Sequence, residues 1–362
     1  MTSEAPPAPH DSAMYRTMHR QPEELRRLLE EGWGPAEAAA DRLRLARRIF
    51  LVGIGTSYHA ALAGEWMLRW VGVDARAVMS PDFADYADSY SLGPGDGVVV
   101  LAHSGTKSST SRSLARALSA GARVVSVGSR TAEHPGSPLV LRTVDRETSA
   151  AFTASHTAAM LVVAQTATRL ALSSRPSLAP VFLNALEALP DQVANVLDRE
   201  NEIAPVAQVA AERLIYAAGA GPSAVSALEV VIKVREAAQG HIDALPLEQF
   251  LHGPLVTVNP EDFGIVVNVS GAMPMTATRT GEVAGVLAAI GTPLWMIGTE
   301  VPQAPEATVF ALPEVIEPLS TILSVVPLQI FANQVAVVRG THPDLFRRDD
   351  PRYAAALSTL AL

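Results

Sequence analysis

The sequence predicts an α/β protein made of two similar domains, each a parallel sheet flanked by helices. Apolar runs of strand length alternate with helical patterns along the chain, which is typical of parallel α/β architecture. Residues 213–223 (RLIYAAGAGPS) also repeat the layout of residues 47–57 (RRIFLVGIGTS). Because a predicted strand precedes and a predicted helix follows each glycine-rich turn, we interpret the repeat as a duplicated domain rather than a chance alignment.

The first half of the chain contains five expected strands and three expected helices. The strands are expected at residues 48–54, 73–79, 97–102, 122–127 and 138–143. The helices are expected at residues 57–71, 108–120 and 153–173. A stretch rich in Ser and Pro, SSRPSLAP at residues 173–180, predicts a hinge, because these residues interrupt regular structure. A helical connector is expected from there to residue 211.

The second half predicts a second set of strands, closed by a long apolar helix near residues 317–338. After the repeated turn, strands are expected at HIDAL (residues 241–245), 263–268, 293–297 and 307–311. These patterns divide the chain into five segments. They are a disordered tail at residues 1–13, a first domain at 14–175, a helical connector at 176–211, a second domain at 212–345 and a C-terminal tail at 346–362.

The composition indicates a soluble globular protein. Of the 362 residues, 48% are hydrophobic and 18% are charged, and no segment approaches the roughly 18 uninterrupted apolar residues of a membrane span. The N-terminus lacks the apolar segment of a secretory signal, so we expect a cytoplasmic protein without a membrane partner. The net charge of -9 argues against a nucleic-acid partner, because phosphate backbones need basic patches. The absence of cysteine excludes disulfides, thiolate metal sites and cysteine nucleophiles.

Two glycine-rich turns, GIGTS at residues 53–57 and HSGT at residues 103–106, each follow an expected strand and open an expected helix. This geometry puts free backbone N–H groups and the positive end of a helix dipole at the carboxyl edge of the sheet, where anions bind. For one turn alone, an equally good interpretation is that Ser57 and Ser108 simply cap the starts of their helices. Two such turns, both rich in hydroxyls, favour a compact phosphate site. A dinucleotide site is disfavoured, because Tyr58 stands where the third glycine should be and no GxxxxGK[ST] loop is present.

Only two of the 28 basic residues are lysines, Lys107 and Lys233. In a chain that otherwise uses arginine, a lysine marks a place where a compact ammonium is needed. For either lysine alone, the simpler explanation is a codon preference for arginine that left two lysines unchanged. On a helix, Glu229, Lys233 and Glu236 lie on one face. The alternative is a solvated face with an ion pair worth a few tenths of a kcal/mol. His252 stands before a Gly-Pro break, and it forms an acid–base pair with a helix carboxylate if both converge on a ligand.

These stretches together resemble the sugar isomerase (SIS) domain family over residues 14–352. The matching motifs are the opening MYRTMHRQP, the GTS turn, a variant of the family's S-x-S-G-x-T loop, the LE...K..E helix, the HGP turn and a closing VPLQIFANQVAVVRGTHPD. The chain looks most like the isomerase half of glucosamine-6-phosphate synthase and stand-alone amino-sugar phosphate deaminases and isomerases. The resemblance implies an α/β fold of two tandem flavodoxin-like SIS domains.

The resemblance also implies roles for individual residues. Residues of the two turns would bind the sugar phosphate; they are Gly55, Thr56, Ser57, His103, Ser104, Gly105, Thr106 and Lys107. Glu236 would move a proton between carbons 1 and 2 of the open-chain sugar, and Lys233 would stand beside these carbons as a positive charge or an amine. His252 would assist ring opening, in the family often at the neighbouring subunit's site. We expect a homodimer with sites completed across the interface, and neither a metal nor an organic cofactor.

The chain departs from the family's pattern in ways that matter for the reaction. The synthase carries a glutaminase domain with a cysteine nucleophile, which this chain lacks. Ala102 stands where the family's loop has a hydroxyl, and Lys107 where it has a threonine, so we expect Lys107 to supply charge that compensates for Ala102. AFTA at residues 151–154 lacks the lysine of the family's ASTK segment. The C-terminal RYAAALSTLAL also lacks a lysine, and LFRRDDPRY before it offers arginines instead.

We therefore expect a phosphosugar isomerase or deaminase that acts on an amino-sugar or fructosamine phosphate through proton transfer by Glu236. The missing glutaminase favours the catabolic direction, because ammonia release needs no ammonia supply. A simple aldose–ketose isomerase is one alternative. A non-catalytic sugar-phosphate sensor is the other, and the retained Glu236 and His252 argue against it.

Overall fold

The computed structural model describes residues 11–269, 274–299, 301, 304 and 306–360. The chain forms two compact units. The N-terminal unit comprises Arg20–Glu147 and Thr153–Pro190, and the C-terminal unit comprises Asp191–Thr359 together with Met1–His19 and Thr148–Phe152. Each unit has its own parallel sheet.

The N-terminal unit is built on a five-stranded parallel sheet with the order β2-β1-β3-β4-β5. Its strands are β1 (Arg48–Gly53), β2 (Ala75–Met79), β3 (Asp96–Leu101), β4 (Arg123–Gly128) and β5 (Val140–Arg142). Every residue of β3 is buried, as expected for a central strand covered on both faces. Val52 of β1 pairs in register with Val100 of β3. The carboxyl ends of these two strands therefore lie next to each other.

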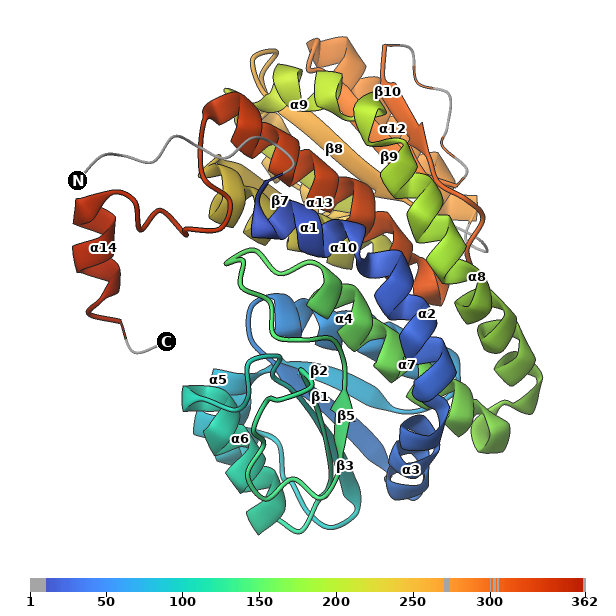
Figure 1. Cartoon of the computed structure of the whole chain (residues 1–362). Coiled ribbons are helices and arrows are strands. Elements are labelled where there is room, and N and C mark those ends of the chain that lie inside the picture. Colours follow the sequence, from blue (N-terminus) through green and yellow to red (C-terminus); the bar gives the residue numbers. More distant parts are fainter. Residues whose placement is uncertain (1–10, 270–273, 300, 302–303, 305, 361–362) are drawn as a thin grey trace. The chain divides into compact units, whose positions relative to one another are not determined.

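Helices cover both faces of this sheet. They are α2 (Gln21–Glu31), α3 (Trp33–Leu43), α4 (Thr56–Trp70), α5 (Ser80–Asp85), α6 (Ser108–Ser119) and α7 (Ala154–Ser174), with short 3-10 turns at Ala87–Ser89 and Pro176–Leu178. Helices α2, α3 and α4 pack against α7, and α5 packs against α6 (Figure 1). Phe50, Phe83 and Val98 belong to the core under α5 and α6. Helix α8 (Ala179–Asp198) contains the boundary between the two units.

The C-terminal unit repeats this plan with the strand order β10-β9-β8-β6-β7, again all parallel. Its strands are β6 (Ile215–Gly219), β7 (Ile242–Pro246), β8 (Phe263–Asn268), β9 (Leu294–Gly298) and β10 (Thr308–Ala311). Its helices are α1 (Ala13–His19), α9 (Ala204–Ala210), α10 (Pro222–Lys233), α11 (Leu247–Leu251), α12 (Pro274–Ile290), α13 (Ser320–Arg339) and α14 (Pro351–Leu357), with a π-helical turn at Val234–Ala238 and 3-10 turns at Glu200–Glu202, Pro254–Thr257 and Glu317–Leu319.

Helix α13 forms the centre of the C-terminal unit. It packs against α10, α9 and α1 (Figure 1). The stretch Glu317–Arg339 is long and apolar enough to cross a membrane, but 83% of its apolar window is buried inside the described structure. It is therefore packed as the core helix of a globular unit.

The predicted α/β class with two parallel sheets is confirmed, and each predicted strand is present within about two residues at either end. Three helices that precede β1 were not expected, and neither were α5, α12 and α14. Residues 1–10 of the expected disordered tail lie outside the described residues, whereas Ser12 is buried and its hydroxyl lies 3.5 Å from Asn333 Oδ1. The expected hinge at residues 173–180 contains a 3-10 turn and the start of α8.

Candidate functional site

The first predicted anion-binding turn lies between β1 and α4. Gly55 caps α4 with φ +57° and ψ -134°, a conformation that side chains disfavour. The Ser57 amide donates to the Ile54 carbonyl at 3.2 Å, and the Tyr58 amide donates to the Gly55 carbonyl at 2.9 Å. Gly55 is exposed, and Thr56 and Ser57 are half-buried. The turn therefore presents the amino end of a 15-residue helix, with two hydroxyl side chains, at the surface of the unit.

The second predicted turn follows β3 and opens α6. Gly105 has φ +93°, and a side-chain carbon there would stand 3.0 Å from the Glu133 carbonyl oxygen. The Thr106 amide donates to that same oxygen at 3.0 Å. Since β1 and β3 are adjacent and parallel, the structure brings both turns to one edge of the sheet, as the sequence predicts. Lys107 is exposed, and its backbone N–H donates to Thr110 Oγ1 at 3.0 Å.

The His103 ring of the second turn faces the protein interior. It is 9% exposed, and its Nε2 accepts a hydrogen bond from the Glu147 amide at 3.2 Å. Burial lowers the pKa of His103, and the nearby Glu147 carboxylate partly opposes this effect. His103 is thus held as a neutral ring under the turn, so its side chain supports the turn from below.

Glu147 is a buried carboxylate that the sequence did not indicate. Its oxygens accept hydrogen bonds from the Thr153 amide at 3.0 Å and the Ser155 amide at 2.5 Å. These amides belong to the first turn of α7, where backbone donors have no partner within the helix. Glu147 therefore joins His103 to the start of α7. Glu147 caps the AFTA segment, residues 151–154. In this region, the only sequence signal was that AFTA lacks the lysine of the family's ASTK segment.

The charged trio of the C-terminal unit is buried rather than solvated. Lys233 Nζ lies 3.3 Å from Glu229 Oε1 and 3.1 Å from Glu236 Oε2. The side chains of Lys233 and Glu229 are 0% exposed, and that of Glu236 is 23% exposed. The alternative of a solvated face with an ordinary ion pair is therefore wrong. One ammonium holds two carboxylates, of which only Glu236 reaches the surface.

Glu236 stands in a π-helical turn rather than in the regular helix that the spacing predicts. Helix α10 ends at Lys233, and the π-helical turn Val234–Ala238 follows. It ends at Gln239, which has a left-handed φ of +54°. Thr341 Oγ1 also donates to the Ala237 carbonyl at 2.9 Å. Such turns are rare and are frequent at functional sites.

Glu236 opens into a pocket of about 430 Å³ that lies within the C-terminal unit. Its lining residues are Arg235, Glu236, Gln239, Gly240, His241, Phe346, Arg347, Tyr353 and Leu357. The last four belong to the C-terminal tail, whose arginines the sequence had already distinguished from the family's lysine. Arg235 and His241 carried no sequence signal.

His252 does not line this pocket. It is 68% exposed on the side-chain scale, and its Nδ1–H donates to the Glu248 carbonyl at 2.8 Å. It follows α11 directly. The structure therefore brings Lys233 and Glu236 together, while His252 presents its imidazole to solvent.

The repeated turn of the C-terminal unit has the same backbone but is closed. Gly221 has φ +55° and ψ -132°, within a few degrees of Gly55. Pro222 removes one backbone donor, and Ser223 Oγ accepts from the Val269 amide at 3.1 Å. Glu317 is 9% exposed, and its Oε1 lies 3.5 Å from where a Gly221 side chain would begin. Burial raises the pKa of this carboxyl.

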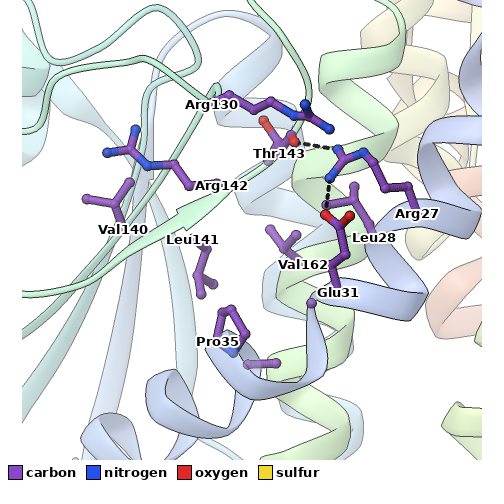
Figure 2. A pocket seen from close by; sticks show the side chains of 12 residues that line it. Arg27, Leu28, Glu31, Pro35, Arg130, Val140, Leu141, Arg142, Thr143 and Val162 are labelled. Carbon is purple, nitrogen blue, oxygen red and sulfur yellow. Dashed lines mark hydrogen bonds and ion pairs between the residues drawn. The ribbon is translucent and has the colours of Figure 1, made fainter.

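A second pocket, of about 280 Å³, lies beside β5 in the N-terminal unit. Figure 2 shows Arg27 directed at Glu31 and at the Thr143 carbonyl, with distances of 2.9 and 2.7 Å. Arg27 also pairs with Glu24. None of the predicted site residues lines this pocket. Elsewhere, the described residues contain no group of three His, Asp or Glu side chains that could hold a metal ion.

Comparison with known proteins gives the family context. Residues 42–169 match the SIS domain. The chain is 29% identical to the isomerizing glutamine–fructose-6-phosphate aminotransferase of Pyrobaculum aerophilum, in an alignment that covers 91% of this chain and 55% of the relative. The chain therefore spans about half the length of this curated relative.

Solved structures share the whole fold at low identity. The C-terminal domain of glucosamine-fructose-6-phosphate aminotransferase from Francisella tularensis superposes with a TM-score of 0.82 at 19% identity, covering 92% of this chain and 98% of that one. Glucosamine-6-phosphate deaminase from Thermotoga maritima gives 0.70 at 18% identity, with 92% and 97% covered. Tagatose-6-phosphate ketose/aldose isomerase from Escherichia coli gives 0.77 at 18% identity, with 95% and 97% covered.

Proposed function

We propose that this protein is a phosphosugar isomerase that also releases the nitrogen of an amino-sugar or fructosamine phosphate. The match of residues 42–169 to the SIS domain and the tandem arrangement of two α/β units along the chain support this proposal. The observation that carries this proposal is Glu236, a partly exposed carboxylate 3.1 Å from the buried ammonium of Lys233. A base next to a fixed cation is suited to removing a proton from a carbon next to a carbonyl.

The base would act on the open-chain form of the sugar. In a 2-amino aldose, Glu236 takes the proton from carbon 2, and Lys233 stabilises the negative charge that develops on the carbon 1 oxygen. The proton returns to carbon 1, and one proton of the amine moves to the carbon 1 oxygen, which leaves a hydroxyl at carbon 1 and an imine at carbon 2. Water adds to this imine, the carbon–nitrogen bond breaks, and ketose and ammonia leave. The π-helical turn matters here because it gives Glu236, unlike Glu229, access to the pocket.

The phosphate would bind to the two turns of the N-terminal unit. Backbone N–H groups at the start of α4 and the hydroxyls of Thr56, Ser57 and Ser104 are suited to a phosphate's oxygens. Lys107 is exposed at the start of α6 and would add a full positive charge. This is the role that we propose for the lysine that replaces the family's threonine.

We further propose that His252 acts in a homodimer, at the site of a second copy of the chain. Its exposed imidazole, 68% accessible and absent from the lining of the Glu236 pocket, supports this role. A cytoplasmic enzyme fits the same proposal, since cytoplasmic metabolism supplies phosphorylated sugars. A simple aldose–ketose isomerase uses the same proton transfer without loss of nitrogen, and the fold shared with the Escherichia coli ketose/aldose isomerase favours it as the second candidate.

The Glu236→Gln variant tests the reaction. We expect it to lose at least about 100-fold in turnover, the lower range for a positioned general base, while the thermal shift caused by the same sugar phosphates is retained. Glu261→Gln, which removes an exposed carboxylate of the same unit, is the matched control and should keep full turnover.

The candidate substrates are amino-sugar, fructosamine and plain aldose phosphates. The product measured is ammonia for the first, the free amine for the second and the ketose for the third. Nitrogen release identifies the deaminase, and isomerisation alone identifies the second candidate. Stabilisation by a sugar phosphate with no turnover of any substrate, in wild type and variant alike, would show a sensor instead of an enzyme.

A further inference from the structure

The Glu236 pocket has a positive charge balance in a chain whose net charge is -9. Two guanidinium groups, those of Arg235 and Arg347, line it with one carboxylate, Glu236. The Lys233 ammonium lies directly behind that carboxylate and is also paired with the buried Glu229, so the charges of Lys233 and Glu229 cancel. A pocket that served only a neutral open-chain sugar would have no use for two further cations.

Within the part of the chain that the structure describes, neither arginine forms an ion pair. The pKa of Asp350 is lowered mainly by its bonds with Arg352, and the Arg347 charge adds to this effect from a longer distance. Arg235 donates to the Ile242 carbonyl at 2.5 Å, and Arg347 lies over the Tyr353 ring with its central carbon 3.8 Å from the ring centre. A carbonyl and an aromatic face orient a guanidinium without neutralising it. Both groups therefore keep donors for a planar anion.

Backbone strain is concentrated at this pocket. Six described residues other than glycine have positive φ, and three of them, Gln239, Phe346 and Arg347, line the Glu236 pocket. Arg347 has φ +57° directly after Phe346 at +51°. Such conformations cost energy and persist where the surrounding structure enforces them, typically at ligand sites. The strained pair lies in the segment of the chain that lines the pocket together with Glu236.

We propose that Arg235 and Arg347 bind a second acidic group of the substrate, a carboxylate on the substituent of the reacting nitrogen. The substrate is then a sugar phosphate whose nitrogen is that of an α-amino acid, rather than a free amino sugar. Phe346 and Leu357 give the same pocket an apolar wall for the amino acid's side chain. This inference rests on the proposed function, since it assigns the second charged group of the same substrate.

Two ligands of equal size test the inference by calorimetry. They are a ketose phosphate joined through its nitrogen to leucine, and the same conjugate of leucinamide, which lacks the negative charge. The Glu236→Gln background keeps both unreacted. We expect the leucine conjugate to bind tighter by about 10- to 100-fold, the range of a hydrogen bond to a charged group. Equal binding of the two ligands would overturn the inference.

Arginine variants on the same background locate the effect. Arg347→Met and Arg235→Met should each weaken binding of the leucine conjugate and leave the leucinamide conjugate unchanged, while Arg347→Lys should restore part of the difference. Arg348→Met is the matched control, because Arg348 is exposed and does not line the pocket. Equal losses for both ligands, or the same loss in Arg348→Met, would show a structural role for Arg347 and reject the subsite.

Turnover by the protein with Glu236 intact separates this inference from the proposed function. Amine release from both conjugates at equal efficiency would support the reaction and reject the subsite. A retained preference for the leucine conjugate in binding, with no amine released from either, would reject the reaction and leave the subsite supported.

Discussion

At the scale of single residues, Lys233 is the most unusual charge in the C-terminal unit. Lys233 is among the largest fully buried side chains in the described structure. A buried ammonium costs several kcal/mol of desolvation unless carboxylates compensate it, and Glu229 and Glu236 both lie within 3.3 Å. Arginine would need more donors satisfied in the same space. The size and few donors of a lysine ammonium therefore explain why position 233 is a lysine in a chain with 26 arginines among its 28 basic residues.

His134 makes stability depend on pH. It is 6% exposed, and burial, with the nearby Arg142 charge, lowers its pKa to about 4. The unfolded chain binds a proton near pH 6.5, so stability is complete above that pH and is lost as the pH falls towards 4. We expect His134 to make the protein about 2 kcal/mol less stable at pH 5 than at pH 8.

Urea unfolding at the two pH values measures this effect. His134→Gln should remove that part of the difference, whereas His241→Gln, which changes an exposed histidine, should keep it. An unchanged pH dependence in His134→Gln would show that other groups are responsible.

At the scale of elements, the start of each helix carries the chemistry of the N-terminal unit. Helices α4 and α6 begin at the two predicted turns, and α7 begins at the Glu147 carboxylate. The first two helices begin at exposed turns, while the third begins at a buried carboxylate that accepts hydrogen bonds from its amides. A helix dipole alone therefore does not identify a binding site. The residue in front of the helix determines whether its first amides can bind a ligand.

The cap of α7 predicts a measurable loss of stability. Glu147→Gln keeps the shape but removes the charge that accepts hydrogen bonds from the Thr153 and Ser155 amides. We expect a fall of about 1–2 kcal/mol in the free energy of unfolding, as for the loss of a good helix cap. Denaturant titration checks it.

Glu187→Gln is the control for this variant, because it makes the same chemical change at an exposed position of α8. Equal stability of Glu147→Gln and wild type would show that the cap does not contribute.

At the scale of the whole chain, the two units share one strand order, and the turn after the first strand of each differs in its side chains. The backbones at Gly55 and Gly221 agree within a few degrees. In the C-terminal copy, a proline replaces a donor residue and a buried carboxylate, Glu317, stands against the turn. Pro222 removes one donor that an anion could use, and the Glu317 carboxylate would repel an anion when it is ionised.

The chain should therefore bind one sugar phosphate, through its N-terminal turn. Calorimetry should give one ligand per chain, and Thr56→Val should weaken binding by about 10-fold, as for a lost hydrogen bond to a charged group. Pro222→Ala, the corresponding position of the closed copy, should leave the affinity unchanged. Two ligands per chain would contradict the closure.

The sequence by itself determined the α/β class, the duplication, the strand positions and the resemblance to the SIS family, and these predictions are confirmed. They depend on local patterns: apolar runs, glycine turns, and the spacing of Glu229, Lys233 and Glu236. The sequence also identified Lys107 and Lys233 as exceptional.

Only the tertiary structure decided which side chains face a ligand. It placed the His103 ring inside, put Glu236 in a π-helical turn, closed the Gly221 turn with Glu317, and brought Arg347 to the pocket of Glu236 from 111 positions further along the chain. The reason is physical. Burial, the desolvation of charges and the hydrogen bonds that compensate it depend on neighbours that are distant in sequence, and no local pattern records them.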